Sequence, residues 1–216
     1  NAITLTSVAN DFTGAVSLNN SGANNVALTD VNALTLGAST LGSGTLTVTA
    51  GGAITQTGAV TQAAGAGAVS ITAGANAITL TNAANDFTGT LTLKGGTVQV
   101  SDANALTALL TTTGAATLTA GGDLTASGSA AGLSTTTSGA GKTTFGTTTV
   151  TGNLSTTSAG AVSQTGALTV TGTSNINAGA NAITLTNAAN DFTGLVTLTG
   201  GVTQITDANA LSAALN

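Results

Sequence analysis

The chain has 216 residues and a net charge of −5, with seven Asp and two Lys, and it lacks Cys, His, Pro, Met, Trp and Tyr. The absence of Cys and His removes disulfides, thiolate nucleophiles and the commonest metal ligands and general bases, and two cationic side chains are too few to bind a nucleic-acid backbone. Hydrophobic residues are 41% of the sequence, unlike a disordered chain, and no apolar run reaches the roughly 18–20 residues of a membrane span, so no membrane insertion is expected.

The first predicted element belongs to a box that opens the chain and returns twice. The sequence NAITLTNAANDFTG occupies residues 76–89 and 181–194, and residues 1–14 differ from it only at Ser7 and Val8. A catalytic site is normally needed once, whereas a building unit is needed many times, so the repetition indicates architecture. We interpret the chain as a single segment of a longer repetitive chain, with repeat blocks at approximately 1–75, 76–180 and 181–216.

Two further boxes follow the first. One, D-x-NAL, begins at Asp30, Asp102 and Asp207, and it follows the NDF sequence at the same distance in the second and third blocks but at a longer distance in the first. The other is GAITQTGAV, which starts at Gly52 and returns as GAVSQTGAL at Gly160. The three NDF sequences are unevenly spaced along the chain, so the repeating unit must vary in length.

Short stretches that alternate apolar residues with Thr, Ser or Gln fill the sequence between the boxes. Each is four to six residues long and is closed by Gly, Asn or Asp, which indicates a strand followed by a turn. Leu46 and Val48 are expected to face inward with Thr45, Thr47 and Thr49 outward. Only DANALTALL, from Asp102, has helical spacing, and it predicts a single helical turn.

These strands predict an all-β fold, and two architectures compete for it. A sandwich or barrel does not require near-identical segments at long intervals, whereas a solenoid stacks equivalent residues into ladders along one axis. We therefore predict a parallel β-helix or solenoid. Coils of roughly 19–20 residues give about 11 coils and, at the ~4.8 Å spacing of strands in a sheet, a rod of about 50 Å.

The polar, aromatic and glycine members of the boxes are the candidate site residues, and we interpret them as structural. Asn is expected to form ladders between coils, Asp to cap turns, Phe to fill the core and Gly to occupy tight corners. The set comprises Asn10, Asp11, Phe12, Gly14, Asp30, Asn85, Asp86, Phe87, Gly89, Asp102, Asn190, Asp191, Phe192, Gly194 and Asp207.

The sequence gives no reason to assign a catalytic residue, a metal ligand or a cofactor. The seven Asp are well separated along the chain and six of them recur in repeats, whereas a catalytic pair would be asymmetric. A calcium site needs about six oxygens, and the one fragment of a calcium-binding repeat, GGDL at 121–124, is not repeated. Rows of T-x-T resemble ice-binding surfaces but fall at irregular positions in the sequence, so we interpret them as solvated strand residues.

The segment NDFTGTLTLKGGTVQVSDANAL (85–106) resembles the β-strand repeats of large bacterial exported proteins. These are the filamentous-haemagglutinin-like two-partner-secretion exoproteins and the autotransporter-associated β-strand repeat, in which an aromatic–Thr–Gly box leads to GGT and a short strand. Residues 87–89 and 95–97 occupy those places, and 192–194 with 200–201 repeat them, whereas the first block departs with LNNSGANNVAL. The resemblance implies a right-handed parallel β-helix in the stalk or passenger region of an adhesin-like protein.

The expected function is that of a non-enzymatic, extracellular rod or filament at the bacterial cell surface. Its expected partners are neighbouring repeats or further copies of itself, stacked end to end through open strand edges. One alternative is an adhesin whose lateral Thr- and Asn-rich face binds surface glycans or another cell. A minor alternative is a polysaccharide-active β-helix enzyme, which would need one cluster of Asp in a groove.

Overall fold

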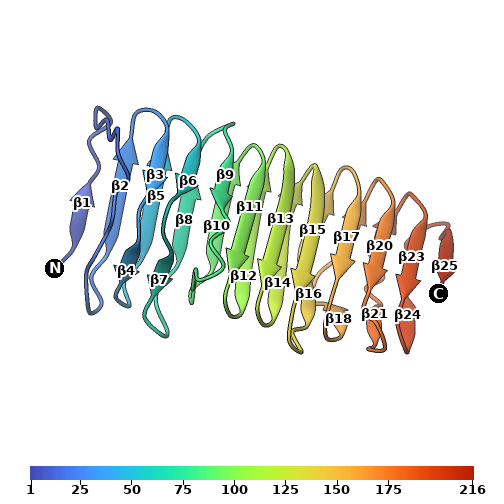
Figure 1. The fold of residues 1–216 in the computed structure, drawn as a ribbon. Helices are drawn as coiled ribbons and strands as arrows, with labels where there is room; N and C mark the ends of the chain where they lie inside the picture. The colour runs from blue at the N-terminus through green and yellow to red at the C-terminus, as the bar shows by residue number, and fades with distance from the viewer.

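The fold follows from the alternating pattern, because every strand places alternate side chains inside. The computed structural model describes all residues 1–216, and it contains 25 strands, all paired in parallel, and no helix long and apolar enough to cross a membrane. The chain winds into a β-solenoid, and 11 strands follow one another along the main path of its largest sheet, one for each turn (Figure 1). The predicted solenoid and its number of coils are confirmed; the right-handed sense stays a prediction.

Three sheets run along the axis. The largest has 13 strands: β1 (Ile3–Leu5), β2 (Val26–Asp30), β5 (Leu46–Ala50), β8 (Val69–Thr72), β10 (Leu91–Gly95), β12 (Leu106–Thr112), β14 (Leu124–Ala130), β16 (Thr143–Val150), β18 (Val162–Gln164), β19 (Leu168–Val170), β21 (Ile183–Leu185), β22 (Asp191–Phe192) and β24 (Thr203–Ile205). The second has 10 strands: β3 (Leu34–Leu36), β6 (Ile54–Gln56), β9 (Ile78–Leu80), β11 (Val98–Asp102), β13 (Ala115–Ala120), β15 (Gly132–Thr137), β17 (Leu154–Thr157), β20 (Ser174–Asn177), β23 (Val196–Thr199) and β25 (Ala213–Leu215). The third pairs β4 (Ser39–Leu41) with β7 (Val60–Gln62).

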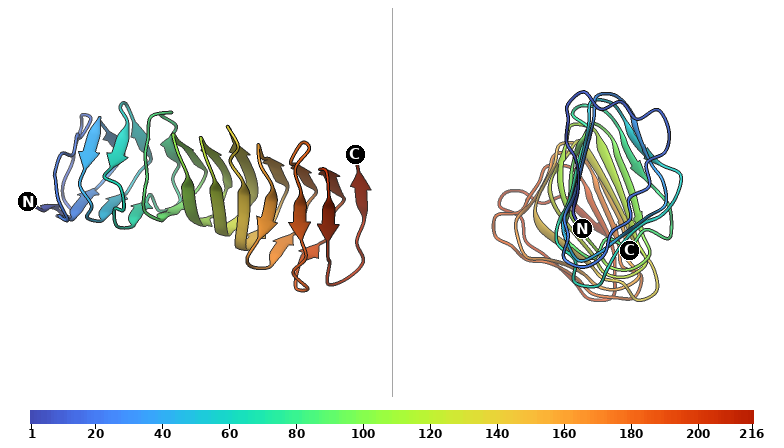
Figure 2. Two further views of the ribbon diagram at one scale, coloured as in Figure 1. Left: turned by 90° about the horizontal axis from the view of Figure 1, so that it is seen from below. Right: turned by 90° about the vertical axis from the view of Figure 1, so that its left-hand side faces the viewer.

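A single core of 44 buried hydrophobic residues runs through the coils. Leu46 and Val48 are buried while Thr45 and Thr47 are exposed, as predicted, and Leu91 and Leu93 repeat the arrangement two coils later. Because equivalent residues stack in register, each inward side chain packs on the one in the next coil. The end-on view shows that the outlines of successive coils are displaced gradually along the axis (Figure 2).

Coil length varies, which explains the uneven spacing of the boxes. Leu46 pairs with Val69 in the next coil, whereas Leu91 pairs with Ala108, a partner that lies closer in the sequence. The longer coils near both ends hold a third strand, whereas the shorter coils between β10 and β15 hold two strands. A third strand per coil appears again after β16, because the first residues of β16 pair with β18 and its last residues pair with β19.

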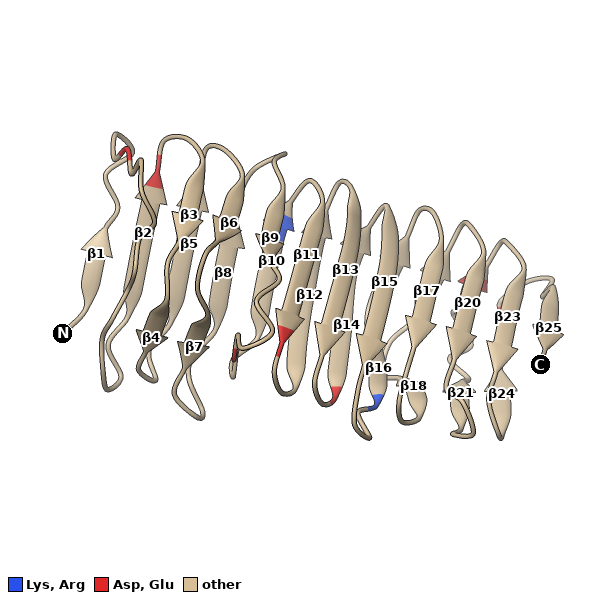
Figure 3. Ribbon diagram, in the orientation of Figure 1, with Lys and Arg blue, Asp and Glu red and all other residues tan.

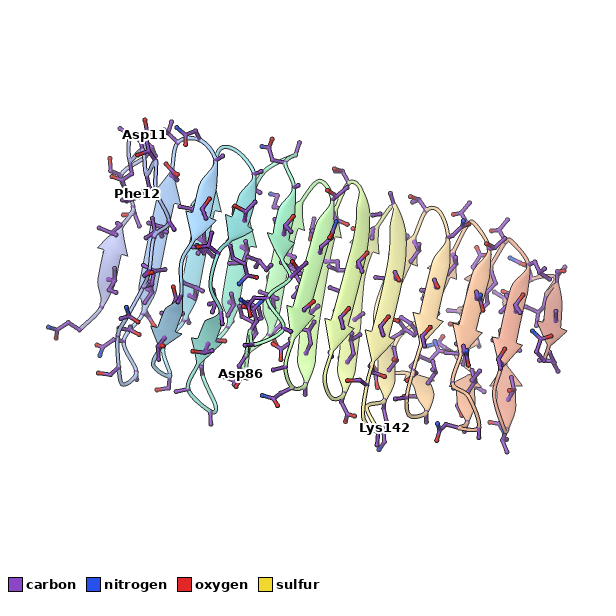
Figure 4. All side chains as sticks on the ribbon, viewed as in Figure 1. Asp11, Phe12, Asp86 and Lys142 are labelled. Atoms are coloured by element: carbon purple, nitrogen blue, oxygen red, sulfur yellow. The ribbon has the colours of Figure 1, made fainter.

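The identical fourteen-residue boxes therefore lie on different sheets. Residues 78–80 form β9 in the 10-stranded sheet, whereas 183–185 and 3–5 form β21 and β1 in the 13-stranded sheet. Asp11 and Phe12 lie at one edge of the rod and Asp86 at the opposite edge (Figure 4). The same fourteen residues can therefore supply a strand to either of the two large sheets.

The predicted helical turn in DANALTALL is wrong. Residues 106–112 form β12, with Leu106, Ala108 and Leu110 buried and the residues between them exposed. The same letters satisfy both a helical and an alternating period, and pairing with β10 and β14 on either side decides for the strand.

A second departure lies in the core of the later coils, where hydroxyl groups replace apolar side chains. Thr135, Thr137, Thr143, Thr156 and Ser158 are all buried. They bond to one another, with the Thr135 hydroxyl donating to Thr156 Oγ1 at 3.1 Å and the Thr143 hydroxyl donating to Ser158 Oγ at 3.1 Å. Threonine therefore serves both faces of the strands, whereas the sequence pattern placed it outside.

Candidate functional site

The side chains that the structure brings together form polar joints between coils. The molecule has no pocket and no group of three or more side chains that could hold a metal ion. Its few charged residues are scattered along the rod, mostly at turns and strand ends (Figure 3). The candidate site is therefore the contact from one coil to the next.

Asn85 is the centre of the most complete joint. Its side chain is 0% exposed, and its amide NH₂ donates to Leu80 O at 3.1 Å, to Ser101 O at 3.1 Å and to Gln56 Oε1 at 2.9 Å. Its Oδ1 accepts from Val60 N at 2.9 Å and from Gln56 Nε2 at 2.8 Å. One amide thus ties its own coil to the coil before and the coil after.

Gln56 supplies the matching amide from the preceding coil. Its Nε2 donates to Asn85 Oδ1 and also to Gly58 O at 2.6 Å, and its Oε1 accepts from Asn82 N at 3.1 Å as well as from the Asn85 amide. The two amides face each other in a reciprocal pair, which is a strong arrangement because neither polar group is left without a partner.

Asp102 completes the joint from the following coil. Its Oδ2 accepts from Phe87 N at 2.7 Å and its Oδ1 from Asn104 N at 2.8 Å. Burial raises the pKa of the Asp102 carboxyl, the two backbone N–H groups oppose that rise, and the Asp86 carboxylate reinforces it. Asp102 therefore acts as a cap for the Phe87 backbone.

The amide pair of this joint recurs in the third block with the same atoms, and Asp207 there accepts one backbone hydrogen bond where Asp102 accepts two. Asn190, also 0% exposed, donates to Leu185 O, Thr206 O and Gln164 Oε1 at 3.1, 3.1 and 2.9 Å. Its Oδ1 accepts from Leu168 N at 2.9 Å and from Gln164 Nε2 at 2.7 Å. Phe192 N donates to Asp207 Oδ1 at 3.1 Å. We call these two arrangements the amide joints.

The first block holds an incomplete amide joint. The Asn10 side chain donates to Leu5 O at 3.0 Å and to Thr29 O at 3.2 Å, and Phe12 N donates to Asp30 Oδ1 at 3.3 Å. These bonds match those of Asn85 and Asn190, but no glutamine faces Asn10, because no coil lies before β1 in the structure.

The remaining predicted residues line the joints. Phe87 and Phe192 are buried in the core, and Phe12 packs against it from a partly buried position. Asp11 and Asp191 accept hydrogen bonds from the side chains of Asn32 and Asn209, at 2.9 and 3.0 Å. The Asp11 and Asp191 carboxylates therefore each stabilise a turn, and these two turns lie in different coils.

The box glycines mark where coils approach closely. A Cβ on Gly89 would clash with the backbone of Gly67, with its carbonyl carbon at 2.7 Å, and one on Gly194 would lie 2.6 Å from the carbonyl carbon of Gly172. A Cβ on Gly14 would meet nothing within 4 Å. Glycine is needed where a preceding coil is present.

Sequence reasoning missed Gln56 and Gln164. The signal was available, because the QTGA sequence precedes both exact copies of the box. The glutamine lies 29 residues before Asn85 and 26 before Asn190, and that difference in spacing hides the pairing unless coil lengths are known.

Outward hydroxyl groups form columns along both large sheets. Thr29, Thr49 and Thr72 are in register in the 13-stranded sheet, and Lys94 follows them. The T-x-T sequences, irregular in the chain, are thus regular in space, but Lys94 interrupts this column and Leu109 faces out beside it. We assign them no binding role.

The Asp102 carboxyl gives a pH-dependent prediction. Its folded pKa is raised above the ordinary value of 3.8, so the folded state binds the proton more tightly than the unfolded state, and this group's contribution to stability is lost as pH rises from the unfolded to the folded pKa. We therefore compare the unfolding free energies of wild type and Asp102→Asn. The value for wild type minus the value for the variant should decrease as pH rises through this window. Urea titrations at several pH values measure it, and parallel curves for the two proteins would contradict it.

Comparison with known proteins agrees with the repeat interpretation. A family model described as Repeats of unknown function (DUF5649) matches residues 1–19, 23–94 and 131–199, well over half of the chain. The chain belongs to this family. The DUF5649 match omits 95–130, which contains the short two-stranded coils. No curated protein and no solved structure matches significantly.

Proposed function

We propose that this chain is a structural section of an extracellular rod or filament on a bacterial surface or secreted protein, and that it works through length and stiffness. The observation that carries the proposal is the unbroken parallel ladder, in which each strand of the main path of the 13-stranded sheet pairs with the next from β1 to β24. Such a ladder places backbone hydrogen bonds along the axis, so bending or stretching the rod strains many of them together.

The amide joints support the same function. Each links three consecutive coils through side chains as well as backbone, at Asn85 and again at Asn190. Because Asn85 and Asn190 are buried and each forms a reciprocal amide pair with a glutamine of the preceding coil, the joints fix the register of coils whose lengths differ. The surface location rests on the resemblance to exported bacterial repeats and on the lack of Cys.

The shape of the isolated protein tests the proposal. We expect small-angle scattering and electron microscopy to show rods of about 50 Å, the length of about 11 strand spacings of ~4.8 Å. A variant with a second copy of residues 91–107, one coil by register, should be longer by about one strand spacing, roughly 5 Å. Compact globular particles, or an unchanged length after the insertion, would refute the rod.

A lateral adhesive face has less support. The hydroxyl columns are the surface it would use, but their outward residues are what a solvated strand face requires, and no observation singles out one part of them. The polysaccharide-active enzyme has no geometric support either, since the carboxylates that cap the joints lie in separate coils and the structure has no pocket beside them.

A further inference from the structure

The N-terminal edge of the rod repeats a surface that the molecule fills twice elsewhere. Residues 1–14 are nearly identical to 76–89 and 181–194, and in the latter two a preceding coil covers the box. Leu80 and Leu185 are 0% exposed there, whereas the equivalent Leu5 is 39% exposed. The chain therefore shows the same site twice with its occupant and once without.

The polar groups of this edge match the occupied sites atom by atom. In the amide joints Asn82 N and Asn187 N donate to a glutamine Oε1 at 3.1 and 3.4 Å. The corresponding groups of the first block are Ser7 N and Asn10 Oδ1, and neither makes a hydrogen bond within the chain. Both would be satisfied by one glutamine placed as Gln56 is placed.

The glycine of the box gives an independent observation. A Cβ at Gly89 or Gly194 collides with a carbonyl of the preceding coil, whereas Gly14 has open space. Nothing within the chain requires glycine at position 14, since its backbone does not adopt a positive φ. The residue fits a surface that a further coil covers closely.

We propose that the N-terminal edge, formed by β1, Ser7, Asn10 and Gly14, is a docking surface for a solenoid coil that carries the QTGA glutamine. The edge continues the established coil-to-coil interface, and the occupant is a coil of the same repeat type. This inference rests on the proposed rod function, because it specifies which coil extends the rod at this end.

The rod's own C-terminal coil does not meet this requirement. Its open strand β24 carries Gln204 at the middle position, exposed, with Ile205 at the third position where Gln56 stands in β6. In the register that β21 and β24 use, Ile205 lies opposite Leu185. A second copy stacked in that register would therefore place an isoleucine beside Asn10, and the Asn10 amide oxygen would lose the side-chain donor that Gln56 and Gln164 supply to Asn85 and Asn190.

The test adds the missing coil to the full chain. Residues 51–75, which directly precede Asn76, are joined before Asn1, once as they stand and once with Gln56→Met in the added copy. We expect the Ser7 amide to exchange with solvent about tenfold more slowly in the glutamine version, the ratio for one net hydrogen bond. Asn10→Ala should remove that difference, because it removes the glutamine's partner.

A second variant, Gly14→Val, tests whether the added coil packs on the N-terminal edge at all. Gly14→Val should leave the unextended chain unchanged in melting temperature, since nothing contacts that position, and should abolish protection of β1 amides in the extended chain. Equal Ser7 exchange with glutamine and methionine would overturn the inference. So would head-to-tail association of the unextended chain that protects β1.

Failure of this inference is distinguishable from failure of the rod. Scattering on the unextended chain reports the rod shape without any added coil. Elongated particles with no coupling between Asn10 and the added glutamine would refute the docking surface alone. Compact particles would refute the rod, whatever the exchange measurements show.

Discussion

Replacing Asn85 with Ala is expected to lower the free energy of unfolding by about 3–5 kcal/mol, because several buried polar groups lose their partners together. The side chain is 0% exposed and makes five hydrogen bonds. Its removal leaves Val60 N–H, the Leu80 and Ser101 carbonyls and the Gln56 amide without these bonds in a space that alanine cannot fill. Asn190→Ala should cost a similar amount, since the joint is the same.

The measurement is urea unfolding followed by circular dichroism, because the chain has no Trp or Tyr for fluorescence. Asn175→Ala is the matched control: Asn175 is exposed on β20 and makes no side-chain hydrogen bond, so its cost should stay within about 0.5 kcal/mol. Hydrogen exchange should place the loss of protection in the coils around β6, β9 and β11. Equal costs for Asn85→Ala and Asn175→Ala would show that the amide joint does not stabilise the rod.

The strands could be predicted because alternation is a local property. The pattern around Leu46 and Val48 needs only neighbouring letters, and the structure buries both as expected. Two expectations were wrong, the helical turn in DANALTALL and the outward position of every strand threonine, and both errors have the same cause. DANALTALL and the inward Thr135 and Thr156 are decided by what lies in the coils before and after them, and a single strand's letters do not carry that information.

The candidate site was predictable only in part. The repeats identified Asn85, Asp102 and their equivalents as a set, and the structure joins these two through Asn85 Nδ2 to Ser101 O and Phe87 N to Asp102. Gln56 was not predicted, because the residues that meet across two coils depend on the length of the coil. The coil that starts at β10 is shorter than the coil that starts at β5. Length is set by corners and third strands, and these have weak sequence signals.

Replacing Gly128 with Ala is expected to lower the free energy of unfolding by about 3–5 kcal/mol, from backbone strain added to a steric clash. Gly128 has φ +95°, in the region that favours glycine, and an added Cβ would collide with Leu110 O and lie 2.9 Å from Leu110 N. The residue sits where the register between β14 and β16 shifts, between Ala126 and Gly128, so the bulge that begins the third side of the later coils depends on it.

Gly74→Ala separates the two causes. Gly74 has φ +60° and nothing within 4 Å of an added Cβ, so its replacement adds the backbone strain alone, roughly 1–2 kcal/mol. The excess cost at Gly128 then measures the clash, because coils about 4.8 Å apart leave no room for a methyl group that points at the neighbouring backbone. Equal costs at the two positions, by urea unfolding and circular dichroism, would mean that the coils can separate at the bulge. The rod would then be flexible at β14–β16, where two strands per turn give way to three.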